Sequence, residues 1–397
     1  MKKIWWILTV LTLARTAMGF QFQSLAVMGP TLITNSNLSY IELGTLIGIY
    51  LLPGILFAIP GGWLGKRFGD KPVVVTGLVM MTIGGSLLAL ADSYHHMFLG
   101  RLLSGLGAVL LNVLMTKMVT DWFAEHRLSV AMGIFITSWP LGISIALLTI
   151  GPLESMIGPE MIFFVPAILC ASVLVLVATI YSNPPQSIEA EKTSIDSSKS
   201  KLTGYEFSGV VMCGLVWSLY NVALILLLSF GPEFLIAQGV TPITSGAIVS
   251  LTSWLIIPAL PLGAWIAERT GNPFTTMGVT FITIAILSWM IPFTSYYLLI
   301  FILLGLVFGP AGGLIMALPA QVLRKENRAI GMGVFFTIYY AGMGIFPVIA
   351  GYARDKTDNP AAPLVLAGII ILCALLSLVC FRLIQIRHSR ISTIAIY

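Results

Sequence analysis

An arginine lies in the middle of the first long apolar segment of the sequence. Arg15 follows Lys3 by 12 residues, so in a helix that rises 1.5 Å per residue it would lie roughly 18 Å into a membrane. A charge at that depth costs several kcal/mol unless it faces a wet cavity and has a partner. A guanidinium is a planar fork of donors that matches a carboxylate. The segment therefore predicts an anion site, and the alternative is a structural arginine that bonds backbone carbonyls or a loop acid.

Further polar and aromatic side chains fall on faces of other apolar segments at helical spacing. A face of the seventh segment matches the position of the Arg15 face in the first, and the fourth segment carries an amide on the stripe of Arg101. These side chains are also explained by packing, or by amide bonds between helices worth about 0.6 kcal/mol each. The predicted substrate-binding residues are Arg15, Gln23, Asn112, Trp217, Tyr220 and Asn221.

Carboxylates are missing from the middle of the apolar segments. All 16 Asp and Glu residues lie in loops or within a turn or two of a segment end. Proton-driven exporters and cation carriers usually need a carboxylate at midplane, so an anionic solute is favoured. Glu42 and Glu233, near segment ends, are the predicted carriers of a coupled proton. No phosphate loop, nucleophile triad or metal cluster is visible, and the sequence predicts no enzyme, no cofactor and no metal.

The elements that position these residues are membrane spans. Hydrophobic residues make up 57% of the 397-residue chain and charged residues 9%, whereas a soluble domain carries about 25% charged residues. The +5 net charge indicates no nucleic-acid partner, because in a membrane protein the position of each charge matters more than the sum. About 20 apolar residues cross a bilayer as a helix. We predict an all-α protein with twelve spans: 4–32, 43–64, 72–91, 97–117, 128–150, 160–181, 207–231, 242–266, 274–292, 296–320, 328–352 and 361–384.

A polar, Ser-rich segment at 183–205 separates six spans from six, which predicts helical bundles at 1–182 and 206–397. Of the 21 Lys and Arg residues, all but four fall on one side of the predicted membrane. The exceptions are Arg15, Arg101, Arg354 and Lys356. Because basic residues mark the cytoplasmic side, we expect an inner-membrane protein whose linker and two termini are cytoplasmic.

The two halves also repeat. An offset of 202 residues pairs Gly44 with Gly246 and Arg67 with Arg269. A constant offset over two spans and their loop is not expected by chance. Parallel repeats of six spans are typical of a large class of secondary transporters, in which the substrate site lies between the halves near midplane.

The loop "GGWLGKRFGDK" after the second span resembles the cytoplasmic signature loop of the major facilitator superfamily. A lysine stands where that signature has an aspartate, and the second-half copy "AWIAERTGN" keeps an acid. "RLLSGLGA" is similar to the fourth-span motif of the superfamily, and "DWFAEHRLSVAMGI" resembles its nitrate, cyanate and organic-anion branches. The resemblance implies alternating access, with inter-span bonds from the loops holding one conformation. The predicted coupling or gating residues are Gly62, Lys66, Arg67, Gly69, Arg101, Glu268 and Arg269, with Glu42 and Glu233.

Together these features predict a secondary transporter for a small anion or carboxylate, with or without a coupled proton. Two alternatives stay open. One is export of a drug or metabolite by proton antiport, and the other is a sensor or assembly factor that has a transporter fold but no net flux.

Overall fold

The computed structural model describes residues 2–123, 127–182 and 202–394. Within these ranges the chain forms helices and no strand, which confirms the all-α prediction. Most of the predicted linker, residues 183–201, lies outside the described residues. The first half contains α1 (Lys2–Val27), α2 (Gly29–Ser36), α3 (Tyr40–Gly48), α4 (Gly54–Phe68), α5 (Asp70–Ala89), α6 (Tyr94–Phe123), α7 (Leu128–Ile157) and α8 (Val165–Ile180). The second half contains α9 (Gly204–Ala237), α10 (Pro242–Thr270), α11 (Pro273–Met290), α12 (Tyr297–Ala317), α13 (Arg328–Thr357) and α14 (Ala362–Ile394).

Ten of the described helical segments are long and apolar enough to cross a membrane, and they coincide with the third to twelfth predicted spans. The first two predicted spans are not among the ten. The first is α1, and it gives way at Met28 to the short helix α2, which has Pro30 in its first turn. The second predicted span is not one continuous helix, because it is divided into α3 and α4.

The division between α3 and α4 follows from the local sequence. Pro53 precedes α4 and has no backbone N–H to continue a helical hydrogen-bond ladder. The chain passes from one helix to the other through tighter bonds, such as Leu51 N to Gly48 O at 3.0 Å and Gly54 N to Leu51 O at 2.9 Å. A hydropathy window does not detect this turn, because the residues that form it are themselves apolar.

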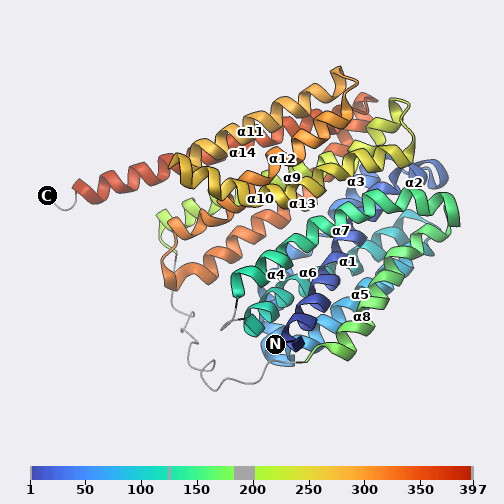
Figure 1. The fold of residues 1–397 in the computed structure, drawn as a ribbon, viewed down its shortest axis with the longest axis horizontal. Coiled ribbons are helices and arrows are strands. Elements are labelled where there is room, and N and C mark those ends of the chain that lie inside the picture. Colours follow the sequence, from blue (N-terminus) through green and yellow to red (C-terminus); the bar gives the residue numbers. More distant parts are fainter. Residues whose placement is uncertain (1, 124–126, 183–201, 395–397) are drawn as a thin grey trace.

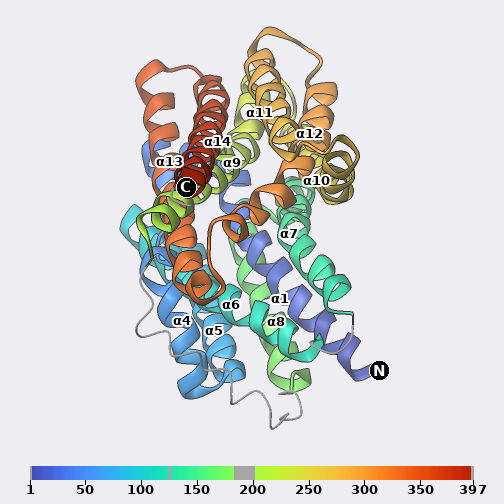
Figure 2. The same cartoon turned by 90° about the vertical axis from the view of Figure 1, so that its left-hand side faces the viewer.

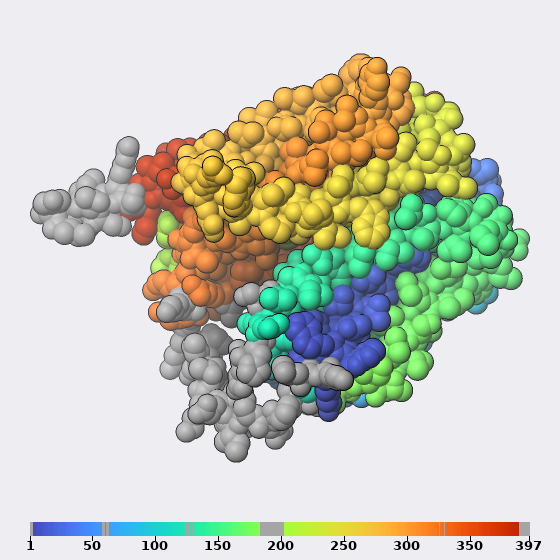
Figure 3. Space-filling model, viewed as in Figure 1, coloured from blue at the N-terminus to red at the C-terminus, as the bar shows by residue number. Residues whose placement is uncertain are grey.

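Helices α1–α8 gather on one side of the molecule and α9–α14 on the other (Figure 1). Across the boundary, α13 packs against α3 and α4, α10 packs against α7, and α9 contacts α1. Figure 2 shows the same two groups from the side, and in the space-filling view α7 meets α10 along this boundary (Figure 3). We call the end of the molecule near Ser182 and Leu202 the linker end, and the end that holds α2 and the start of α3 the far end.

Several glycines bring the halves into backbone contact, among them Gly44, Gly48, Gly246 and Gly351. A Cβ added at Gly44 of α3 would overlap the carbonyl oxygen of Pro347 in α13, and one at Gly246 of α10 would overlap that of Leu147 in α7. These are the two glycines that the offset of 202 residues pairs in the sequence. The close approach requires glycine at both positions, since any larger residue would push the helices apart.

Candidate functional site

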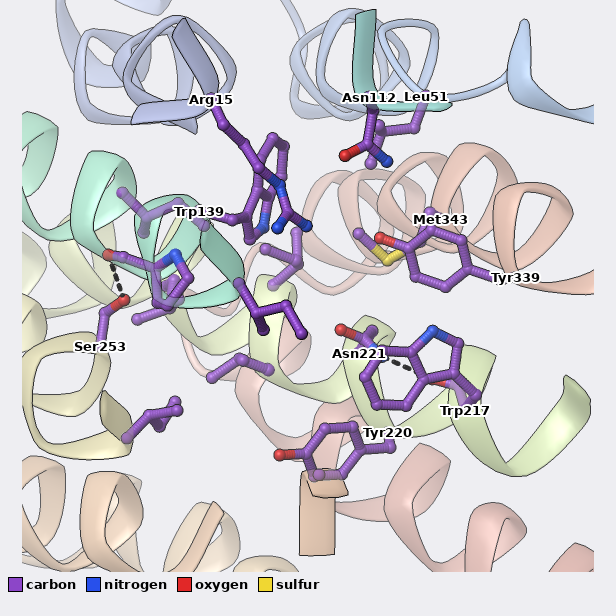
Figure 4. Close-up of a pocket in the computed structure, with 18 of the residues that line it drawn as sticks. Arg15, Leu51, Asn112, Trp139, Trp217, Tyr220, Asn221, Ser253, Tyr339 and Met343 are labelled. Atoms are coloured by element: carbon purple, nitrogen blue, oxygen red, sulfur yellow. Dashed lines mark hydrogen bonds between the residues drawn. The ribbon is translucent and has the colours of Figure 1, made fainter. Parts of the chain in front are cut away.

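A cavity of about 310 Å³ lies between the two halves (Figure 4). Its walls come from α1, α6 and α7 of the first half and from α9, α10, α12 and α13 of the second. The volume is at the lower end of the roughly 300–1,000 Å³ that is usual for small-molecule sites. The cavity can therefore enclose a small organic molecule or a hydrated ion.

The cavity brings together most of the residues that the sequence nominated for substrate binding. The exception is Gln23, which does not line it among the described residues. Gln23 is fully buried, and its Nε2 donates to the backbone oxygen of Leu228 at 2.9 Å, which ties α1 to α9. The predicted residues that do line the cavity are Arg15, Asn112, Trp217, Tyr220 and Asn221.

Arg15 reaches into the cavity from α1, opposite Trp217 and Asn221 (Figure 4). Its Nη1 donates to the backbone oxygen of Phe135 at 3.1 Å, and its guanidinium carbon lies 4.7 Å from the centre of the Phe135 ring. Its buried Nε has no hydrogen-bond partner. Among the described residues no carboxylate pairs with it, and it is the single charged side chain in the cavity lining. The guanidinium is thus only partly satisfied by the protein.

An aromatic wall faces this guanidinium. The Trp217 ring is nearly parallel to that of Tyr220, with centroids 5.8 Å apart, and 6.2 Å from that of Tyr339. Trp139, Tyr339 and Tyr340 also line the cavity and are not among the residues predicted from the sequence. Met343, four residues after Tyr339 along α13, also lines the cavity, but Phe335, four residues before it, is fully buried outside the lining, so helical spacing alone does not identify Tyr339.

Most other polar groups of the lining are bonded to the protein itself. The Tyr220 hydroxyl donates to the backbone oxygen of Phe308 at 2.7 Å, and Asn221 Nδ2 donates to that of Trp217 at 2.8 Å. Asn112 Nδ2 makes a long contact of 3.5 Å with the Tyr340 hydroxyl, while Asn112 Oδ1 is buried without a partner. A hydrogen-bond acceptor is therefore left open on α6.

Arg101 lies outside the cavity lining and is 1% exposed. Its Nε donates to Leu46 O at 3.0 Å, its Nη1 to Gln21 O at 3.0 Å and its Nη2 to Phe22 O at 3.2 Å. The guanidinium carbon also lies 4.5 Å from the centre of the Tyr50 ring. This arginine therefore joins α6 to α1 and α3, and its polar groups are engaged within the first half.

The signature loop joins α4 to α5. Gly62, Lys66 and Arg67 lie in α4, and Gly69 supplies the positive φ of +89° at the junction. The acid of this loop is Asp70, which pairs with Lys117 of α6. The aspartate of this loop, at position 70, therefore forms an ion pair within the first half. The lysine at position 66 is not part of that pair.

The predicted inter-span bonds of the two loop arginines are not among the hydrogen bonds of the described chain. Arg67 instead lies 5.2 Å from the Trp63 ring and Arg269 lies 5.3 Å from the Trp265 ring, each on its own helix. Glu268 precedes Arg269 near the end of α10 and is exposed. In this conformation the loop arginines do not connect the halves.

A polar cluster at the far end connects the halves, and we call Tyr40, Glu233, Arg354 and Asp355 the far-end latch. The Tyr40 hydroxyl donates to Glu233 Oε1 at 2.9 Å, and Arg354 Nη2 donates to the same oxygen at 3.2 Å. The Asp355 carboxylate accepts from the backbone N–H of Tyr40 at 2.9 Å and of Ile41 at 2.8 Å. The start of α3 is thereby bound to α9 and α13.

The two acids predicted as proton carriers have different surroundings. Glu233 is 9% exposed, and its Oε2 is buried without a hydrogen-bond partner. Glu42 instead forms a capping box with Ser39, whose backbone nitrogen donates to Glu42 Oε2 at 2.9 Å. Glu42 is therefore occupied at the start of α3, whereas Glu233 belongs to the contact between the halves.

The linker end has a different pattern. Lys117 pairs with Asp70 and Asp121 within the first half, and Arg324 pairs with Glu206 within the second. Among the described residues, the hydrogen bonds that cross between the halves join them at the far end and around the cavity, and none joins them at the linker end.

Comparisons with known proteins agree with this architecture. The family model described as Major Facilitator Superfamily matches residues 11–347 and again 207–394. The hexuronate transporter of Bacillus subtilis (strain 168) is 23% identical over 385 residues, which is 90% of each chain. The lysosomal dipeptide transporter MFSD1 of Danio rerio is 23% identical and covers 85% of this chain and 77% of its own.

Solved structures show the same fold. The crystal structure of the peptide transporter POT in complex with sulfate has a TM-score of 0.74 at 16% identity, and covers 96% of this chain and 95% of its own. A bacterial homolog of the human lysosomal transporter Spinster, in an inward-facing and unoccupied conformation, has a TM-score of 0.71 at 16% identity, and covers 98% and 97%. The chain is a multi-pass membrane protein that belongs to the Major Facilitator Superfamily.

Proposed function

We propose that this protein is a secondary active transporter that moves a small anion, most simply a carboxylate, by alternating access. The observation that carries the proposal is Arg15, the single charged residue among the described residues that line the cavity, which has no carboxylate partner. An arginine in the membrane is expected to face a counter-charge, and an anionic solute would supply it. The name of the hexuronate transporter, whose solute is an acid, is consistent with this class.

We further propose that α1 and the α3–α4 pair cross the membrane together with the ten apolar helices, which gives twelve spans in two bundles. The first bundle is 1–182, the second is 206–397, and 183–205 is a cytoplasmic linker. The distribution of Lys and Arg supports an inner-membrane location with both termini in the cytoplasm. On this orientation the linker end faces the cytoplasm and the far end faces outward.

The conformation fits one state of a transport cycle. The far-end latch and the contact at Gly44 hold α3 against α13, while no hydrogen bond of the described residues joins the halves at the linker end. This pattern supports a state in which the solute exchanges with the cytoplasm. Opening to the outside would require the latch to separate, because its bonds connect two bodies that must move apart.

For a coupled proton, Glu233 is the better candidate of the two predicted acids. Protonation at its partnerless Oε2 would remove the charge that holds Arg354 and so weaken the latch. Glu42 lacks such a role because its carboxylate caps α3. A symporter built this way would bind its proton from the outer side.

The test of the proposed function is substitution of Arg15 in protein reconstituted into liposomes. Arg15→Lys keeps the charge but loses the planar fork, so we expect weak anion counterflow, and Arg15→Ala should show none. Both variants should fold. Arg387→Ala, which removes an exposed arginine outside the cavity, is the matched control and should transport normally.

Three results would change the conclusion. If Arg15→Ala binds the anion with unchanged affinity, the arginine is a brace between helices. A ligand that proves to be a cationic drug would favour the exporter alternative. Anion binding to the intact protein without any counterflow would indicate a sensor with a transporter fold.

A further inference from the structure

Most of the cavity lining is apolar, and three of its polar groups are already bonded to the protein. The Tyr220 hydroxyl and Asn221 Nδ2 already donate to backbone oxygens, and Ser253 Oγ donates to the backbone oxygen of Pro140 at 2.9 Å. Arg15 Nε and Asn112 Oδ1 are buried without partners. Among the hydrogen bonds of the described residues, none engages Asn221 Oδ1, the Tyr339 hydroxyl or the indole nitrogens of the two lining tryptophans. The rest of the lining is mostly aliphatic, methionine, glycine and aromatic.

The apolar part of the lining has a defined shape. Trp217 lies nearly parallel to Tyr220 of the lining, at an interplanar angle of 22°, and to the fully buried Phe335 outside the lining, at 23°. In Figure 4 the Trp217 and Tyr220 rings lie across the cavity from Arg15, and the Tyr339 ring lies to one side of its guanidinium. A flat ring in the solute could stack on such a surface, since offset-stacked aromatic groups pack with centroids about 4.5–7 Å apart.

We propose that the solute is an organic monoanion with a flat, apolar body, of the arylcarboxylate type. This inference rests on the proposed function and makes it more specific. One guanidinium balances one negative charge, so a dicarboxylate would enter with a charge left over. The carboxylate would bind at Arg15, and the ring would stack at Trp217.

The same chemistry disfavours a sugar acid. A hexuronate carries several hydroxyl groups, and each would lose its water on entry into a lining that is mostly apolar. The identity of 23% to the hexuronate transporter leaves room for such a difference in solute. We therefore expect this chain to discriminate against polyhydroxy acids even though a relative is named for one.

The experiment is a binding series on the full-length protein in lipid nanodiscs, followed by counterflow in liposomes. The probes are 3-phenylpropionate, its dicarboxylate analogue phenylsuccinate, glucuronate, and the cation phenethylammonium. We expect 3-phenylpropionate to bind at least about tenfold more tightly than glucuronate, because each hydroxyl buried without a partner is penalised. Phenylsuccinate should be weaker than 3-phenylpropionate, and phenethylammonium should not bind.

Two variants separate the contributions of charge and stacking. Trp217→Leu keeps an apolar side chain but loses the ring, and should weaken 3-phenylpropionate binding about three- to tenfold while leaving glucuronate binding unchanged. Trp6→Leu, at a 63% exposed tryptophan of α1, is the control. It should leave the binding of 3-phenylpropionate and of glucuronate unchanged.

The outcomes separate a failure of the arylcarboxylate inference from a failure of the proposed anion transport. Tighter binding of glucuronate that is lost in Arg15→Ala would overturn the arylcarboxylate class and keep the anion transporter. If phenethylammonium binds and none of the anions does, both the arylcarboxylate class and the proposed anion transport are overturned. Failure of 3-phenylpropionate to bind, or an equal effect of Trp217→Leu on both acids, would also overturn the inference.

Discussion

Replacing Gly44 with alanine should move the protein away from the conformation described above. The added Cβ would come closer than 3.0 Å to the carbonyl oxygen of Pro347, a distance that real Cβ atoms essentially never show. Overpacking of this kind typically costs about 1–3 kcal/mol, and only the state with α3 against α13 would incur it. A free-energy difference of that size shifts the equilibrium between the closed and the open far end about 5- to 150-fold. The far end should therefore open.

The opening can be measured as the distance between spin labels at the far end. Asn37 and Asn359 are exposed there, one in each half, and can be replaced by cysteine after Cys373 and Cys380 are changed to serine. We expect Gly44→Ala to increase the population of long distances between the two labels. Gly246→Ala should act in the same direction, because its Cβ would meet Leu147 O across the α7–α10 contact.

Gly133→Ala is the control, since a Cβ at Gly133 of α7 has nothing within 4 Å. It should leave the label distances unchanged. The reasoning is refuted if Gly44→Ala remains folded, as judged by its melting temperature, and gives the same distance distribution as Gly133→Ala. In that case the contact between α3 and α13 would be elastic enough to accommodate a methyl group.

Three further results are expected. Glu233→Gln should abolish accumulation of the anion driven by a pH gradient while counterflow persists, as measured in liposomes; normal accumulation would remove Glu233 from the coupling. Glu42→Gln should keep the pH response and lower the thermal stability slightly, because it weakens the charged part of a helix cap worth about 0.5–2 kcal/mol. A cysteine placed in the 183–205 linker should react with impermeant reagents only from the cytoplasmic side, and labelling in intact cells would contradict the topology.

Hydropathy predicted ten of the helices well, because crossing lipid requires long apolar segments that are visible locally. The second span was harder, since the turn that begins after Gly48 and ends at Pro53 contains only apolar residues. The α3–α4 division therefore depends on backbone hydrogen bonding, which a hydropathy average does not contain.

The cavity was predictable where one helical face carried an unusual residue. Arg15, Asn112 and Trp217 stand out from apolar surroundings, and helical spacing placed their neighbours. Tyr339 was missed because α13 carries aromatic residues on several faces, and only packing against α9 decides which face points inward. The role of Gln23 could not be predicted, since its bond to Leu228 joins residues 205 positions apart.

The single guanidinium in the cavity lining has an electrical consequence. On the proposed function, a bound anion makes the loaded carrier neutral at this site, and its change of conformation moves little charge through the membrane. The empty carrier keeps the arginine charge, and switching its access from one side to the other moves that charge through part of the transmembrane field. A full elementary charge is worth about 2.3 kcal/mol per 100 mV. For the proposed anion carrier, we therefore expect the return of the empty protein, and not the passage of the solute, to be the step that senses voltage.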